Sequence, residues 1–166
     1  SWQILIMGQG SHEPQLRQLA IQKSLSNVHF IPFGSKEKVN EVLSLADFAW
    51  ISFAHLPVLK TNSPNKFFDA LAAGKVILVN HKGWVYDLVK THQLGISCLP
   101  SKIDSAFAKL EELENTPEKL IKMGANSRLL AEKYFNKELA ISRLTHAINP
   151  KSITQNSTDE KDIMTA

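Results

Sequence analysis

The sequence predicts an α/β fold, in which a parallel β-sheet is flanked by helices and the C-terminal part is helical only. Short apolar runs of strand type alternate with segments of helical periodicity over roughly the first hundred residues. The run Val76–Val79 is apolar at every position, as is typical of a parallel strand that is buried on both faces. From Ser101 onward the pattern is helical throughout. Alternation of this kind predicts βαβ units with right-handed crossovers.

The predicted strands are short apolar runs that end in turn residues. Gly8-Gln9-Gly10 closes the first run, and Pro32 with Gly34 closes the second. Because Gly8-Gln9-Gly10 lacks the third glycine of a dinucleotide fingerprint, we interpret it as a tight turn between a strand and a helix. The predicted strands are Trp2–Met7, Val28–Ile31, Phe48–Phe53, Val76–Val79 and Gly95–Leu99.

The predicted helices fill the intervals and the C-terminal part. Thr116-Pro117 and Asn136 mark the breaks between the last three, and residues 54–62 are expected to form a loop. The predicted helices span residues 12–25, 35–46, 63–74, 83–92, 101–114, 117–135 and 137–148. Ligands of parallel sheets bind beyond the carboxyl ends of the strands, where the 54–62 loop and the start of the 63–74 helix should lie.

The helix at 63–74 has clear start and stop signals but an unusual charge in its first turn. Ser63 is predicted to cap it, Pro64 to occupy its first position and Gly74 to end it. Lys66 lies near the positive end of the helix dipole, and no Asp or Glu stands beside it there. A bound phosphate would resolve this conflict, because helix N-termini and lysine side chains both attract anions.

Asp69 stands three residues after Lys66, so both side chains project from one face of the helix. A carboxylate beside a phosphate site suits a nucleotide ribose, whose two hydroxyls can donate to it. A surface ion pair between Lys66 and Asp69 explains the spacing about as well, and both interpretations stay open at this point.

Composition indicates a soluble globular protein: of 166 residues, 43% are apolar and 21% charged. We expect one domain at 1–149 and a mobile polar tail at 150–166. The net charge of +3 is spread along the chain and does not support a nucleic-acid partner. Cys98 is the single cysteine, and no apolar run approaches the length of a membrane span, so we expect a cytoplasmic protein. The start at Ser1, without Met, suggests a fragment.

Several catalytic classes lack their signatures. The histidines show no paired ligand spacing, so no metal site is expected. The sequence contains neither the G-x-S-x-G elbow of α/β-hydrolases nor a Walker motif.

The sequence resembles the C-terminal, donor-binding half of a GT-B glycosyltransferase of the retaining family 4 (group 1) type, and most of all the bacterial enzymes that build surface polysaccharides. The block from Ser63 to Lys75 is the most specific part of this resemblance, which covers residues 2 to about 148. The matching segments are Ile4–Gly10, Asn27–Phe33, Ala46–Phe48, Ser63–Lys75, Gly83-Trp84 and Met123–Arg128.

The resemblance implies a Rossmann-like domain that binds a nucleotide-sugar, with a UDP-sugar expected and no metal or other cofactor. Lys66 would be the catalytic residue, which stabilises the leaving diphosphate, and Asp69 would bind the ribose. Asp69 replaces the second Glu of the family's E-x7-E motif, and Thr61 replaces the first, so that Thr61, Asn62 and backbone N–H groups would contact the sugar. The implied donor-binding residues are Gly10, Phe33, Thr61, Asn62, Ser63, Asn65, Lys66 and Asp69.

The resemblance also implies parts that this chain lacks. These are the N-terminal acceptor-binding domain and an upstream strand and helix that carry phosphate-clamping Arg and Lys residues, so the fragment alone is expected to be inactive. The expected activity is that of a hexosyltransferase acting on a glycan or lipid-linked acceptor, in the cytoplasm or peripherally on the inner face of the membrane. Two alternatives remain: a sugar-nucleotide epimerase or phosphorylase of the same fold, and a non-catalytic interaction module on a Rossmann-like scaffold.

Overall fold

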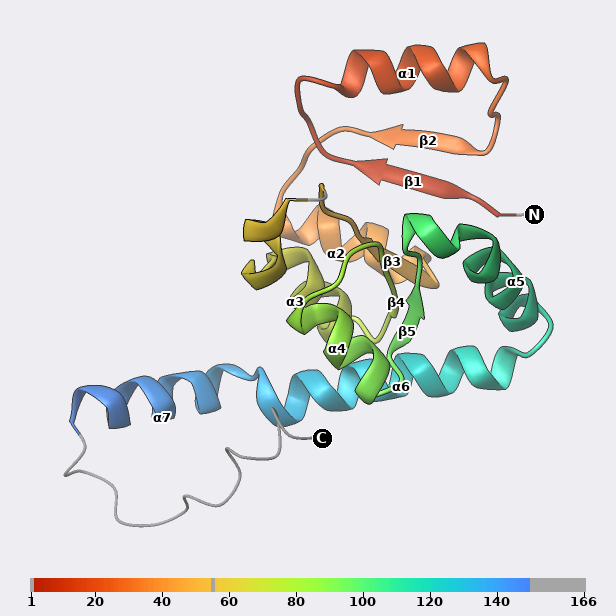
Figure 1. The fold of residues 1–166 in the computed structure, drawn as a ribbon. Helices are drawn as coiled ribbons and strands as arrows, with labels where there is room; N and C mark the ends of the chain where they lie inside the picture. The colour runs from red at the N-terminus through yellow and green to blue at the C-terminus, as the bar shows by residue number, and fades with distance from the viewer. Residues whose placement is uncertain (1, 55, 150–166) are drawn as a thin grey trace. The chain divides into compact units, whose positions relative to one another are not determined.

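The computed structural model describes residues 2–54 and 56–149 (Figure 1). The chain divides into two compact units, Ser1–Leu45 and Ala46–Ala166, and each is described by itself. The single domain expected at 1–149 therefore stays a prediction. The expected tail at 150–166 lies outside the described residues.

The first unit is a two-stranded parallel sheet with two helices. Each residue of β1 (Ile4–Met7) pairs with its counterpart in β2 (Val28–Ile31), from Ile4 opposite Val28 to Met7 opposite Ile31. The two helices are α1 (Glu13–Gln22) and α2 (Lys36–Leu45). The Ser35 Oγ accepts a hydrogen bond from the Lys38 backbone N–H at 3.4 Å, which caps α2. No described side chain of this unit is fully buried, so it has little hydrophobic core of its own.

The second unit contains a three-stranded parallel sheet in the order β3-β4-β5. Its strands are β3 (Phe48–Ile51), β4 (Val76–Val79) and β5 (Gly95–Ser97). All four residues of the central strand β4 are buried, as its apolar run predicted. The alternation of strands and helices therefore gives the expected α/β architecture of parallel sheets, with a helical C-terminus.

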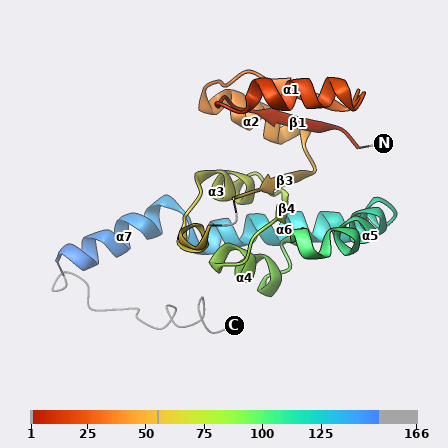
Figure 2. The same cartoon turned by 45° about the horizontal axis from the view of Figure 1, so that its top comes forward.

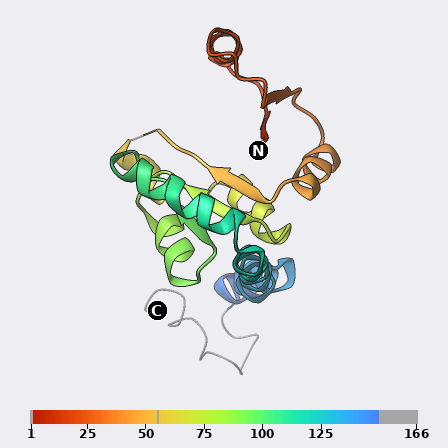
Figure 3. The same ribbon diagram turned by 90° about the vertical axis from the view of Figure 1, so that its right-hand side faces the viewer.

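Helices cover both faces of this sheet (Figures 2 and 3). On one face, Ile77 and Val79 pack with side chains of α3 (Asn65–Ala72) and α4 (Trp84–Thr91). On the other, Leu78 packs with side chains of α5 (Ile103–Glu114). The long helix α6 (Pro117–Tyr134) contacts α3 and is followed by α7 (Lys137–Ile148).

The start of α3 differs from the prediction. Its N-cap is Pro64, in an extended conformation with ψ 125° and without a side-chain cap. The expectation that Ser63 caps the helix and Pro64 is its first residue was therefore wrong. Pro64 is buried, and its carbonyl accepts the Phe67 N–H at 3.0 Å, so tertiary packing moves the helix start along the chain.

The end of α3 follows the prediction closely. Gly74 has φ 65°, in the left-handed region that glycine adopts readily. The Gly74 N–H donates to the Leu71 carbonyl at 2.9 Å, and the Lys75 N–H donates to the Ala70 carbonyl at 3.0 Å. These two bonds form a Schellman motif, so the helix stop encoded by Gly74 is confirmed.

Two short 3₁₀ helices occupy places predicted as non-helical or as part of a longer helix. They are η1 (Pro57–Thr61), within the expected 54–62 loop, and η2 (Pro100–Lys102), just before α5. Each begins with a proline, whose fixed φ suits a helical turn. Single turns are too short to produce the periodicity from which longer helices are predicted.

Ser127 offers a test of core packing. Its side chain is fully buried in α6, and among the described residues its Oγ has no hydrogen-bond partner. A buried hydroxyl without a partner costs about 1–3 kcal/mol. We expect Ser127→Ala to raise the free energy of unfolding by about 1 kcal/mol, measured by urea denaturation. A loss of stability would show that the hydroxyl is satisfied in solution.

Candidate functional site

The carboxyl ends of β3, β4 and β5 meet at one edge of the sheet in the second unit (Figure 1). Three segments leave the sheet there: the chain that leads from β3 through η1 to α3, the turn from β4 to α4, and the turn from β5 to η2. Parallel sheets bind ligands at this edge, and most of the predicted site residues lie on the first of these segments.

Lys66 projects from the first turn of α3 toward the end of β3. Its Nζ donates a hydrogen bond to the Ser52 carbonyl at 2.8 Å and lies 5.1 Å from the centroid of the Phe53 ring. Burial lowers the pKa of Lys66 from its ordinary value of 10.5, although part of the side chain remains exposed. The structure thus gives the ammonium group a backbone partner at the sheet edge.

Asp69 is half-buried and stands one turn further along α3. The spacing of three residues places it on the same side of the helix as Lys66. A cation and a carboxylate are therefore presented together near the carboxyl ends of the strands.

Asn80 holds the segment that follows β3, and sequence reasoning did not single it out. Its Oδ1 accepts the Phe53 N–H at 2.9 Å, and its Nδ2 donates to the Phe53 carbonyl at 3.0 Å. The buried His81 packs edge-on against the Phe53 ring, with 4.6 Å between ring centroids. A polar residue directly after the buried run of β4 is the signal that could have identified Asn80.

The Gly83-Trp84 turn anchors the loop that contains η1. The Trp84 indole N–H donates to the Asn62 carbonyl at 2.9 Å. Gly83 has φ 144°, and a Cβ at this position would overlap the Lys60 carbonyl. Glycine is therefore required there for both conformation and space, and the end of η1 is held against the start of α4.

The predicted donor-binding residues fall into two groups. Thr61 ends η1, Asn62 and Ser63 lie between η1 and α3, and Asn65 begins α3. All four are exposed, and they lie in the same segment of the chain as Lys66 and Asp69. Gly10 follows β1, and Phe33, which is 67% exposed, follows β2. These two residues belong to the first unit, so their place in a common site stays a prediction.

A cavity of about 440 Å³ opens at the same edge, between η1, the β4–α4 turn and the β5–η2 turn. Its walls are mostly apolar, and Lys60 and Lys82 also line it. Lys66 and Asp69 are not among its lining residues.

Neither a metal cluster nor a membrane-spanning helix occurs in the part of the chain that the structure describes. There, no three His, Cys, Asp or Glu side chains are grouped in a way that could hold a metal ion. No helix in residues 2–54 and 56–149 combines the length and apolar character needed to cross a bilayer. Metal independence stays a prediction.

Comparison with known proteins identifies a family for this chain. A family model described as "Glycosyl transferases group 1" matches residues 1–130. An uncharacterized glycosyltransferase of Haemophilus influenzae is 29% identical over 135 residues, which cover 80% of this chain and 36% of the relative.

A solved structure, sucrose-phosphate synthase from Thermosynechococcus elongatus, superimposes with a TM-score of 0.71 at 19% identity. The match covers 88% of this chain and 38% of that protein, and it shows a shared GT-B type fold. The chain thus spans little more than a third of the length of either protein. Because the family model covers most of the chain, the protein belongs to the group 1 glycosyl transferases.

Proposed function

We propose that this chain is the donor-binding portion of a retaining glycosyltransferase. The enzyme would transfer a sugar from a nucleotide-sugar, with a UDP-sugar expected, to a glycan or lipid-linked acceptor in surface polysaccharide synthesis. The family match and the glycosyltransferase relative support sugar transfer. The observation that carries the donor assignment is the position of Lys66, in the first turn of α3 and hydrogen-bonded to the end of β3.

The chemistry of sugar transfer explains why a cation would be needed there. As the bond between the anomeric carbon and the diphosphate breaks, negative charge grows on the phosphate oxygens. Backbone N–H groups in the first turn of α3 and the Lys66 ammonium would stabilise that charge. The Ser52 carbonyl and the Phe53 ring hold the ammonium in place before the donor arrives, which reduces the cost of ordering it.

The other proposed roles follow the order of the segment. Asp69 would accept hydrogen bonds from the two ribose hydroxyls, and Thr61, Asn62 and Ser63 would contact the transferred sugar. The acceptor-binding domain and the remaining phosphate-binding residues would come from the rest of the protein, since the chain spans 36% of its relative. We further propose that the enzyme is cytoplasmic, needs no metal ion and contacts the inner face of the membrane peripherally.

Nucleotide binding tests the proposal directly. The melting temperature of the protein should rise with UDP, or with another nucleoside diphosphate, and not with NAD. Lys66→Gln should reduce this shift, whereas Lys122→Gln, which changes an exposed lysine on α6, should leave it unchanged. A melting temperature that responds to no nucleotide would contradict the proposal and favour a non-catalytic interaction module.

Replacing Asp69 by alanine should weaken nucleotide binding by about 10- to 150-fold, since a hydrogen bond to a charged acceptor contributes about 1.5–3 kcal/mol. Asp69→Glu should retain much of the affinity. Isothermal titration with UDP measures both, and Glu111→Ala, an exposed acid on α5, serves as the matched control. Unchanged affinity in Asp69→Ala would remove the ribose assignment.

The affinity for UDP should depend on the titration of Lys66. Burial lowers the pKa of this amine, and only its protonated form attracts a diphosphate. Affinity should therefore fall as the pH rises through this lowered pKa, below the 10.5 of an ordinary lysine. In Lys66→Arg, whose guanidinium stays charged, this fall should disappear. A fall that persists in Lys66→Arg would assign the pH dependence to another group.

A further inference from the structure

The cavity between η1 and the β5–η2 turn is lined by two kinds of surface. Leu56 and Leu59 contribute aliphatic side chains from the η1 segment, and Leu99 and Pro100 contribute apolar surface from the opposite wall. Lys60 and Lys82 add two exposed cations. The lining that the structure describes contains no acidic side chain, so nothing within the cavity offsets their charge.

Two large aliphatic side chains are exposed on the η1 segment, which forms one wall of the cavity. Leu56 is 56% exposed and Val58 is 71% exposed, and both lie on the η1 segment. Large aliphatic groups that are exposed together next to a basic cavity are typical of a binding surface for a partly apolar ligand.

The walls of the cavity are held in place by contacts already described. The Trp84 indole bonds the Asn62 carbonyl, and the backbone of Gly83 lies against that of Lys60. Lys60 and Lys82 therefore stand on segments that are fixed to each other. A cavity that exists before binding loses little free energy to ordering when a ligand enters.

The cavity is next to Lys66 but separate from it. His81 lines the cavity and packs against Phe53. The Lys66 ammonium, which bonds the Ser52 carbonyl, lies over the Phe53 ring. Two cationic positions thus lie on either side of Phe53 and His81 at one edge of the sheet. A ligand in the cavity would not displace a diphosphate bound at Lys66.

We propose that this cavity binds an alkyl phosphate, with its phosphoryl group on Lys60 and Lys82 and its chain along Leu56, Leu59 and Leu99. Two sources share this chemistry: the phosphate of a lipid-linked acceptor, and the headgroup of an anionic membrane lipid. The first source rests on the proposed glycosyltransferase function, and it would bring the acceptor close to the donor. The binding chemistry itself does not depend on that function.

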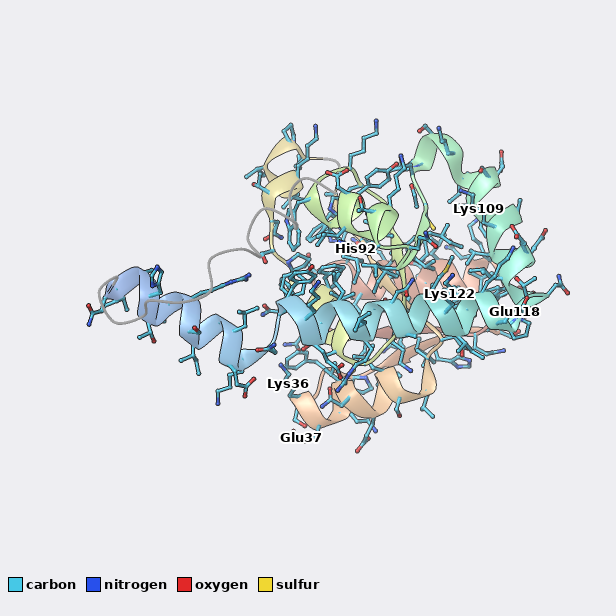
Figure 4. The ribbon with its side chains drawn as sticks, turned by 90° about the horizontal axis from the view of Figure 1, so that it is seen from below. Lys36, Glu37, His92, Lys109, Glu118 and Lys122 are labelled. Atoms are coloured by element: carbon cyan, nitrogen blue, oxygen red, sulfur yellow. The ribbon has the colours of Figure 1, made fainter. Side chains whose placement is uncertain are left out.

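Octyl phosphate, a soluble alkyl phosphate, is the direct probe, and isothermal titration measures its affinity. We expect it to bind at least tenfold more tightly than inorganic phosphate, which lacks the chain, and octyl glucoside, which lacks the charge. The double variant Lys60→Gln/Lys82→Gln should lose at least tenfold in affinity. The matched variant Lys109→Gln/Lys122→Gln, which changes two lysines on α5 and α6, should bind like the unchanged protein (Figure 4).

Leu59→Ser should weaken the binding of octyl phosphate but leave the binding of inorganic phosphate unchanged. UDP binding should be unchanged in the double variant, which keeps this test independent of the nucleotide proposal. Octyl phosphate that binds no better than octyl glucoside, or equally well to the double variant, would overturn the proposal.

Vesicles then distinguish the two sources. We expect the protein to sediment with phosphatidylcholine vesicles that contain a polyprenyl phosphate, and the double variant to remain in solution. If vesicles containing phosphatidylglycerol bind equally well, the ligand is a membrane headgroup; if they do not, it is a lipid-linked acceptor. Binding to neither type of vesicle would contradict the proposal.

Discussion

Replacing Lys66 by alanine will lower the rate of sugar transfer by the whole enzyme by about 10²- to 10³-fold, the usual effect of removing one preorganised donor to a developing negative charge. The ammonium stands at the carboxyl edge of the sheet, hydrogen-bonded to the Ser52 carbonyl at 2.8 Å. Steady-state kinetics of the purified enzyme measure the effect. Lys66→Arg should retain part of the transfer rate, because arginine keeps the positive charge.

The stability of Lys66→Ala separates a phosphate-binding lysine from a structural one. Removing the side chain relieves its conflict with the helix dipole, by about 0.3–1 kcal/mol, but it also removes the contacts with Ser52 and Phe53. These effects oppose each other, so we expect the free energy of unfolding to change by less than about 1 kcal/mol. A strongly destabilised but fully active Lys66→Ala would contradict the phosphate assignment.

Gly95→Ala will destabilise the second unit by about 3 kcal/mol or more, at the upper end of overpacking effects. Gly95 is the register partner of Ile77, and a Cβ at Gly95 would overlap the Ile77 backbone. Because β4 is buried along its whole length, its backbone has no room to move aside. The strand β5 would have to shift, and with it the wall of the cavity at Leu99.

Urea denaturation followed by tryptophan fluorescence measures this loss. Gly10→Ala is the matched control, since a Cβ at Gly10 meets no atom within 4 Å and its φ is not in the left-handed region. A Gly95→Ala protein as stable as the control would show that β4 and β5 are less closely packed in solution than in the structure.

Local sequence signals were sufficient for the order of the elements and for several of their bounds. The apolar run of β4 and the β2 strand have the predicted limits, and α7 begins and ends at the predicted residues. Asn136 caps α7 by accepting the Leu139 N–H at 2.7 Å. These features depend on residues within a few positions of one another, which is why periodicity, caps and glycine stops could predict them.

Only the tertiary structure decided the contacts between distant segments. Lys66 bonds the carbonyl of Ser52, which is 14 residues away. Asn80 bonds both the N–H and the carbonyl of Phe53, which is 27 residues away. The burial of Pro64, which moved the start of α3, likewise depends on packing that no local pattern contains. The sequence by itself determined that a strand would be followed by a helix with a cation in its first turn. The tertiary structure decided which carbonyl holds that cation and which cavity opens beside it. Both depend on where the chain returns to the same edge of the sheet, because side chains far apart in sequence meet only after the strands have paired.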